Sequence, residues 1–179
     1  MISPSIGVVT GVSLAHTVRM DDMGKIVHDL KELTRSIPKL ICNTDFKELE
    51  SGFKPVATYA TGKSADVAIV SAARAKSGKL TAQLTVFGTK IEVKTQLVGR
   101  HSLSALLAAA TVAHELGMDT AVIAKTLATI SAVKGRMNLL PGVHESILID
   151  DTYNAASPVG VFAALDTLVE MKGHKVAVL

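Results

Sequence analysis

The stretch at 146–171 reads SILIDDTYNAASPVGVFAALDTLVEM and decides the fold class of the chain. Its first four residues form an apolar, strand-like run, and its last thirteen residues follow a helical pattern. Another apolar run, HKVAVL at 174–179, follows the helix. The order strand, helix, strand predicts a parallel α/β sheet with a right-handed crossover.

The junction between that first strand and the helix carries more polar groups than a turn needs. Ser157 before Pro158 already supplies a capping signal for the helix. Two carboxylates, a phenol and a carboxamide precede it, namely Asp150, Asp151, Tyr153 and Asn154. Open α/β sheets bind ligands beyond the carboxyl ends of their strands. The junction is therefore a candidate ligand site.

The rest of the chain continues the α/β pattern. A corner at Phe87-Gly88-Thr89-Lys90 predicts a hairpin, and Asp119 is a candidate helix cap. The basic turn KGR at 134–136 is the candidate boundary between two domains, 1–134 and 135–179. β-Branched and alternating patterns predict strands at 5–13, 39–43, 55–60, 65–74, 79–88, 89–97 and within 137–151, and helical spacing predicts helices at 21–37, 45–52, 102–117, 119–130 and 158–172.

Composition excludes several classes of protein. Of 179 residues, 48% are hydrophobic and 20% charged, and the net charge of +3 is spread without a block of like charges. We therefore expect neither a nucleic-acid partner nor a membrane-bound protein, since no apolar run approaches the roughly 20 residues of a membrane span. The lone Cys42 excludes an internal disulfide and favours a cytoplasmic location.

Six segments, in order along the whole chain, resemble motifs of the Mur ligases, the ATP-dependent amide-forming enzymes of peptidoglycan precursor synthesis. The junction LIDDTYNAASP resembles most the members that add D-alanyl-D-alanine to a UDP-N-acetylmuramoyl tripeptide. The segments are IGVVTGVSLAH (6–16), DLKEL (29–33), LICNTD (40–45), GRHSLSALLAAATVAHELG (99–117), KGRMNLL (134–140) and LIDDTYNAASP (148–158).

The resemblance implies a fold, substrates and cofactors. It predicts the later part of a central ATPase domain, followed by the first β-α-β unit of a Rossmann-like C-terminal domain. ATP would activate the substrate carboxylate as an acyl phosphate, which the amine of D-Ala-D-Ala would attack, with Mg²⁺ as the metal. We expect a monomer.

The resemblance also assigns site residues. His16 and Lys31 would bind magnesium and serve the chemistry, with Lys31 carbamylated so that it presents an oxygen ligand. From the residues alone, a turn histidine and a solvated helix lysine are the stronger readings. Arg136, Asp151 and Asn154 would contact the nucleotide across the domain cleft, where a forked guanidinium suits phosphate and a carboxylate suits ribose hydroxyls. On sequence alone, a surface arginine is the stronger reading of Arg136.

Departures from the family pattern leave rivals open. Two asparagines of the family's helix motif fall at Ser102 and Ala105, and a strand-end asparagine is Gly11 here. Gly62-Lys63-Ser64 lacks the first glycine of a phosphate loop. We therefore expect a fragment of a longer enzyme that is inactive alone. The alternatives are a related amino-acid ligase, a non-catalytic remnant of the fold, or, less strongly, a generic Rossmann-type binding domain.

Overall fold

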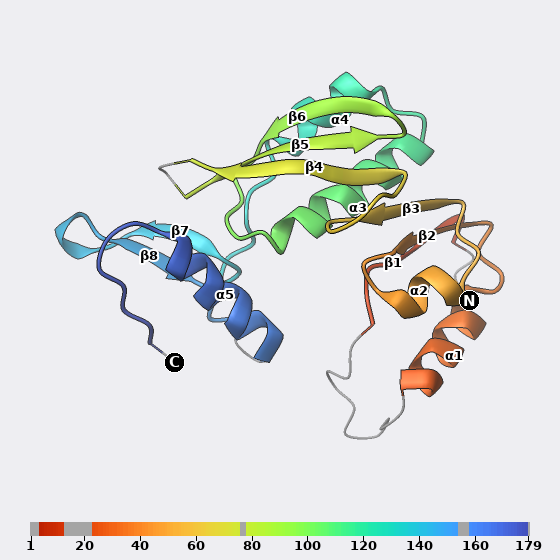
Figure 1. Cartoon of the computed structure of the whole chain (residues 1–179), viewed down its shortest axis with the longest axis horizontal. Coiled ribbons are helices and arrows are strands. Elements are labelled where there is room, and N and C mark those ends of the chain that lie inside the picture. The colour runs from red at the N-terminus through yellow and green to blue at the C-terminus, as the bar shows by residue number, and fades with distance from the viewer. Residues whose placement is uncertain (1–3, 13–22, 76–77, 154–157, 179) are drawn as a thin grey trace.

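The structure is a computed structural model of the chain that describes residues 4–12, 23–75, 78–153 and 158–178. It consists of two parts (Figure 1). The first, here called the body, is a six-stranded sheet with the strand order β1-β2-β3-β4-β5-β6 and the helices α1 to α4. The second, here called the lobe, is a two-stranded sheet, β7-β8, with helix α5. The mixed α/β class predicted from the sequence is confirmed.

The boundaries of the elements follow the predicted pattern closely. The strands are β1 (Ile6–Val9), β2 (Lys39–Asn43), β3 (Ala57–Ala60), β4 (Val67–Arg74), β5 (Leu80–Val86), β6 (Thr89–Lys94), β7 (Asn138–Pro141) and β8 (Ile147–Asp150). The helices are α1 (Met23–Thr34), α2 (Lys47–Gly52), α3 (Ser102–Glu115), α4 (Thr120–Leu127) and α5 (Pro158–Glu170), with a short 3₁₀ turn at Val143–Glu145.

Strands β1, β2 and β3 are parallel and covered on both faces. Alternate residues of β2 enter different cores, because successive side chains of a strand point to opposite faces. Leu40 and Cys42 pack with α1 and α2 residues such as Leu49, whereas Ile41 joins the larger core under α3. This two-sided burial explains why β2 reads as a continuous apolar run.

Strands β4, β5 and β6 form an antiparallel ribbon with one wet face. Burial in β5 alternates residue by residue, with its apolar side chains from Leu80 to Val86 facing the core. The predicted hairpin corner is confirmed, since Phe87 and Gly88 both have positive φ, as a two-residue turn of the primed type requires. The larger core of the body is therefore mostly aliphatic, with Tyr59 fully buried in it, and it spans both halves of the sheet.

The connection from β3 to β4 is unusual, because two parallel strands usually need a crossover of a dozen or more residues. Here only Thr61 to Asp66 join them. The pairing involves the last two residues of β3 and the first two of β4, Tyr59 with Val67 and Ala60 with Ala68. The strands are staggered, so the chain only steps sideways, and β4 extends beyond the carboxyl ends of β1 to β3.

Helices α3 and α4 form the predicted pair. Gly117 ends α3 with positive φ, and the backbone N–H of Met118 donates to the carbonyl of Ala113, as in a Schellman cap. The carboxylate of Asp119 accepts from the N–H of Ala121 at 2.8 Å and begins α4. Both local signals read from the sequence are confirmed.

The lobe differs from the prediction in one element. We expected a strand at 174–179 to complete a parallel β-α-β unit, but residues 174–178 form no strand, and β8 pairs antiparallel with β7. Val176 and Val178 are 70% and 93% exposed. A strand is stable only with a hydrogen-bonded neighbour and a buried face, and this segment has neither among the described residues.

Candidate nucleotide site

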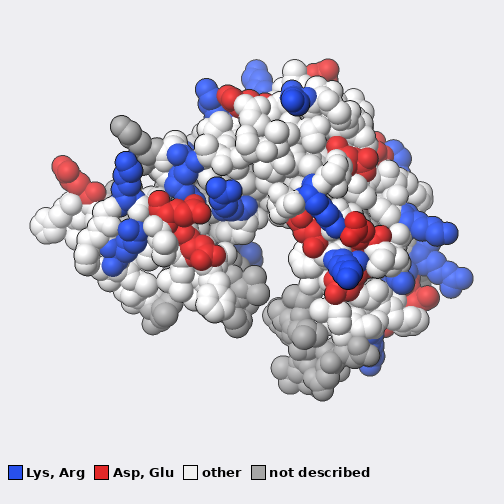
Figure 2. Space-filling model, viewed as in Figure 1, with Lys and Arg blue, Asp and Glu red and all other residues white. Residues whose placement is uncertain are grey.

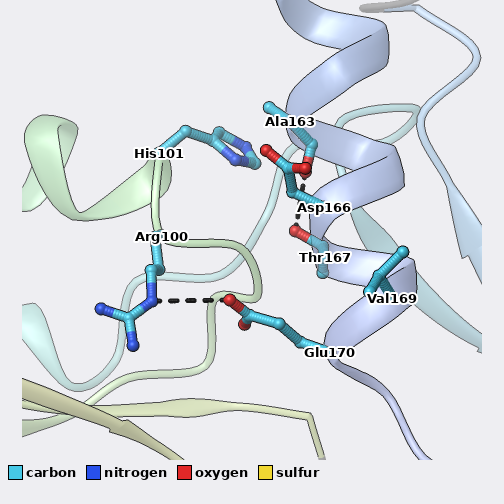
Figure 3. Close-up of a pocket in the computed structure, with 7 residues that line it drawn as sticks. All are labelled: Arg100, His101, Ala163, Asp166, Thr167, Val169 and Glu170. Atoms are coloured by element: carbon cyan, nitrogen blue, oxygen red, sulfur yellow. Dashed lines mark hydrogen bonds and ion pairs between the residues drawn. The ribbon is translucent and has the colours of Figure 1, made fainter.

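Two cavities adjoin at the start of α3, one within the body and one between the body and the lobe. The first, here called the sheet cavity, has a volume of about 420 Å³ and lies at the carboxyl ends of β2 and β3. The second, here called the helix cavity, has about 340 Å³ and faces α5 (Figure 3). Arg100 and His101 line both. In the space-filling view a notch separates the lobe from the β1–β3 end of the body (Figure 2).

Polar groups at the ends of β2 and β3 shape the sheet cavity. Asn43 is only 2% exposed, and its amide nitrogen donates to the carbonyl of Thr10 at 3.0 Å and to the hydroxyl of Ser104 at 3.4 Å. The side-chain oxygen of Asn43 accepts from the N–H of Asp45 at 3.0 Å. Asn43 therefore ties β1, β2 and α3 together at one edge of the sheet.

Asp45 anchors the short connection that follows β3. Its carboxylate accepts from the N–H of Thr61 at 2.8 Å, from the Thr61 hydroxyl at 2.7 Å and from the N–H of Gly62 at 3.0 Å. Burial alone would raise the pKa of Asp45, but these hydrogen bonds and the charge of Lys63 outweigh it, so the pKa is lowered. The carboxylate stays ionised at neutral pH.

Apolar side chains form the remaining walls of the sheet cavity. Two of these side chains are Phe46, just before α2, and Leu103 in α3. The other two, Ile69 and Ala72, come from the part of β4 that extends beyond the neighbouring strands. Few polar groups on mostly apolar walls are typical of pockets for small ligands.

At the helix cavity, the carboxylate of Glu170 lies between two arginines. Glu170 at the end of α5 accepts from Nε of Arg74 at 3.1 Å and lies 3.6 Å from Nε of Arg100 (Figure 3). Arg74 is mostly buried, at 13% exposure of its side chain, and also donates to the carbonyl of Gly78 at 2.7 Å. These contacts join the lobe to β4 and to the loop before α3.

Two glycines let α5 approach the body. Gly78 and Gly99 have positive φ, and a Cβ at Gly78 would lie 2.9 Å from the side chain of Met171. A Cβ at Gly99 would lie 3.0 Å from the hydroxyl of Thr167, a residue that is 3% exposed. Larger residues at these glycines would push α5 away.

His101 lies between the cavities and close to the end of β8. Partial desolvation lowers the pKa of its imidazole, and the nearby carboxylate of Asp151 opposes this shift. The ring is therefore neutral at physiological pH and can both donate and accept hydrogen bonds.

The turn at 135–137 is clamped to the residues that follow β8. Asp151 accepts from the N–H of Met137 at 2.9 Å, and the N–H of Tyr153 donates to the carbonyl of Gly135 at 3.0 Å. The guanidinium carbon of Arg136 lies 4.7 Å from the centre of the Tyr153 ring. The structure thus brings together Arg136 and Asp151, two of the residues that the sequence assigned to the nucleotide.

Comparison with known proteins identifies the family. Residues 1–113 match the sequence model of the Mur ligase middle domain. The chain belongs to this family. The assignment from sequence motifs is confirmed, and the parallel-dominant sheet agrees with it.

Relatives and solved structures extend the match over the lobe. The UDP-N-acetylmuramate–L-alanine ligase of Nostoc punctiforme is 27% identical over 99% of this chain and 37% of its own length. The UDP-N-acetylmuramoyl-tripeptide–D-alanyl-D-alanine ligase of Escherichia coli is 35% identical over 50% of this chain and 20% of its own.

Among solved structures, MurF from Acinetobacter baumannii matches 97% of this chain and 39% of its own, with a TM-score of 0.82 at 23% identity. MurF from Thermotoga maritima in complex with ADP matches 95% of this chain and 40% of its own, with a TM-score of 0.78 at 21% identity. This chain therefore spans about two fifths of the length of these Mur ligases.

The predicted metal ligands gain no support from the structure. His16 lies outside the described residues. Lys31 is exposed in the last turn of α1, its Nζ is 5.8 Å from the centre of the Phe53 ring, and it lies against Gly52. Neither Lys31 nor Gly52 lines either cavity.

The magnesium site predicted at His16 and Lys31 is not tested by the part of the chain that the structure describes. That part holds no group of three or more His, Cys, Asp or Glu side chains that could bind a metal. The pairing of His16 with Lys31 stays a prediction, and so does the role of Asn154, which also lies outside the described residues. We derive no chemical step through a metal.

Sequence reasoning missed several residues of the site. Arg100, Asn43, Asp45 and Thr61 line the cavities, yet none was assigned a role. The polar run Asn43-Thr44-Asp45 directly after a buried strand was a usable signal, because the carboxyl ends of parallel strands gather at one edge. The partners of Glu170 could not be found this way, since Arg74 is 96 positions away.

Cys42 has the buried, structural role expected of it. It is fully buried in the core beneath α2, and burial raises the pKa of its thiol to about 11. A thiol of this kind stays protonated and is a poor nucleophile. No helix in the described ranges has both the length and the apolar character needed to cross a bilayer.

Proposed function

We propose that this chain is part of an ATP-dependent ligase that joins D-Ala-D-Ala to a UDP-N-acetylmuramoyl tripeptide. The observation that carries the proposal is the pair of adjoining cavities at the start of α3, one of which lies between the body and α5, in a chain of the Mur ligase middle-domain family. Asp151 lies near His101, which lines both cavities, and accepts from the N–H of Met137 next to Arg136. A site at the junction of two parts suits a reaction that needs closure around a nucleotide. We place this ligase in the cytoplasm.

The residues of the site fit a nucleotide in part. The apolar walls of the sheet cavity suit the base, and the hydroxyl of Ser104 offers a hydrogen bond there. The amide nitrogen of Asn43 already donates to Thr10 and Ser104, so Asn43 holds Ser104 in place. The anionic Asp45 disfavours phosphate there, so we assign the phosphates to the side of Arg100 and Arg136. Asp151 is the acceptor for a ribose hydroxyl. Ala105 offers no hydrogen bond to the base, which predicts weak binding.

The chain's own contribution to the chemistry is orientation and charge. Bound ATP supplies the phosphoryl group that activates the carboxylate of the peptide substrate. Arg136 makes no ion pair with any described residue, so its guanidinium is available to neutralise the charge that develops on a phosphoryl group. Neutral His101 can hold a substrate oxygen or the base without adding charge.

The amino-acid substrate has a second candidate. Several cyanobacterial relatives that align over most of this chain are named for the addition of L-alanine to UDP-N-acetylmuramate. The D-Ala-D-Ala assignment rests on the motif at 148–158 and on the relative in Escherichia coli, which covers half the chain. A phosphate-release assay on the protein that carries this chain separates them, since only the true acceptor and its amine together release phosphate.

The nucleotide site is tested by binding of ADP to the full chain, measured by NMR titration so that millimolar affinity is detected. We expect saturable binding, and Arg136→Ala should weaken it about tenfold, the effect of losing a charge-assisted hydrogen bond. Wild-type protein that binds no ADP at millimolar concentration would contradict the proposal and favour a non-catalytic remnant. Leu148→Ala, on the exposed outer side of β8, is the matched control and should bind as wild type.

A further inference from the structure

Tyr153 belongs to the polar junction, but its ring has no role in the nucleotide site as described so far. The side chain is 70% exposed, so it contributes little to a core. Its backbone N–H donates to the carbonyl of Gly135 at 3.0 Å, which places the ring beside the turn that carries Arg136. The guanidinium carbon of Arg136 lies 4.7 Å from the ring centre.

The ring of Tyr153 is the group that stabilises the Arg136 side chain. The backbone N–H of Arg136 donates to the carbonyl of Val133 at 2.9 Å. The charged side chain of Arg136 has no carboxylate partner among the described residues. An arginine whose guanidinium plane lies against an aromatic face keeps all of its N–H donors available, because the ring then does not contact the guanidinium edge. A carboxylate partner would instead occupy those donors.

The local backbone is built for this arrangement. Gly135 has φ of +74°, and a Cβ there would lie 3.1 Å from the Cβ of Tyr153. Met137 is 4% exposed, also has positive φ, and donates its N–H to Asp151. The two segments are therefore joined on both sides of Arg136, which fixes the base of its side chain relative to the ring.

We propose that Tyr153 is a positioning residue that holds the guanidinium of Arg136 ready for the phosphates of the nucleotide. The proposal rests on the proposed function, because it assumes that Arg136 binds phosphate. It makes a different claim from the proposed function, namely that the ring of Tyr153, 17 positions further along the chain, orients the Arg136 side chain.

The test compares ADP with adenosine as probes of the full chain, in an NMR titration. Tyr153→Leu removes the aromatic face but keeps an apolar side chain, and should weaken ADP binding about two- to fivefold, the size of an exposed cation–π contact. Tyr153→Phe keeps the face and should bind ADP as wild type. Adenosine lacks phosphate, so its affinity should be unchanged in both variants.

Matched controls separate positioning from a general effect on folding. Phe162 is another exposed aromatic residue, at 65%, on α5, and Phe162→Leu should leave ADP affinity unchanged. In an Arg136→Ala background, Tyr153→Leu should have no further effect, because the two residues act as one unit.

The outcomes of the two proposals are distinguishable. If Arg136→Ala leaves ADP affinity unchanged, the assignment of Arg136 fails and the role of Tyr153 fails with it. If Arg136→Ala weakens ADP binding but Tyr153→Leu does not, only the positioning role fails. Equal weakening by Tyr153→Leu and Tyr153→Phe, or a full effect of Tyr153→Leu in the Arg136→Ala background, would also overturn it.

Discussion

The body and the lobe are stabilised by different kinds of contact. The body has two buried aliphatic clusters, one on each face of its sheet. Neither cluster includes a described residue of β7, β8 or α5, and apolar side chains of the lobe such as Leu148 and Phe162 are more than half exposed. The lobe is held instead by an ion-pair cluster, two close glycine contacts and the buried Thr167. Among the described residues, the body therefore has buried apolar clusters of its own, whereas the lobe is attached mainly by polar and close backbone contacts.

Removing core volume should show the largest difference between the two parts. Leu107 is fully buried in the body, so Leu107→Ala should lower the free energy of unfolding by about 3 kcal/mol through lost burial and a cavity. Leu148 is 54% exposed in the lobe, and Leu148→Ala should change it by less than about 0.5 kcal/mol. Urea denaturation measures both. Equal losses would mean that the lobe has a core of its own.

Breaking the attachment of the lobe should have the next largest effect. Glu170→Gln leaves the mostly buried Arg74 without its carboxylate, so the amides of α5 should exchange about five- to thirtyfold faster while those of β5 stay unchanged. Asp166 lines the same cavity on the same helix without an ion pair among the described residues, so Asp166→Asn is the control. Exchange that is faster in both variants would show a general loss of helix stability.

Within the body, the loop anchored by Asp45 should contribute less than the core. Asp45→Ala removes acceptors for two backbone N–H groups and should lower the free energy of unfolding by about 1 kcal/mol. The pKa of Asp45 is lowered in the folded state, so its stabilising contribution is present above its ordinary pKa of 3.8 and is lost as pH falls below it. Acid denaturation of the variant should start from a lower stability and fall less steeply below about pH 4.

The smallest effect should come from His101, at the contact of the two parts. Its pKa is lowered in the folded state, so below the ordinary histidine pKa of 6.5 the unfolded chain takes up a proton that the folded chain does not. Stability should therefore fall slightly as pH drops from neutral to about 5. His101→Gln should flatten this slope in thermal unfolding. An unchanged slope would show that the ring does not titrate differently on folding.

The body was more predictable from sequence than the lobe, for a physical reason. The hairpin at Phe87–Gly88, the cap at Asp119 and the alternation in β5 are signals in which neighbouring residues determine the structure. The strand expected at 174–179 depended instead on a neighbour to pair with, and an apolar run does not specify one. The same holds for the short parallel step from β3 to β4, which the sequence pattern alone did not reveal.

Some residues of the candidate site could likewise be predicted from local motifs, and others could not. Arg136 and Asp151 belong to local motifs, and the structure brings them together. Arg100 and Glu170 are 70 positions apart and meet only because α5 packs against the loop before α3. The convergence of His16 and Lys31 was the central sequence prediction, and it remains untested because His16 lies outside the described residues. Lys31 itself lies beside Phe53 and away from both cavities.

The short connection from β3 to β4 determines which residues of β4 line the sheet cavity. Ile69 and Ala72 reach the cavity only because β4 starts beside the last residues of β3 and continues past them. Each residue of register moves a strand by about 3.3 Å, and only a shift of two keeps its faces unchanged. A shift of two residues in the register of β4 would therefore place other side chains of the same face in the wall of the sheet cavity.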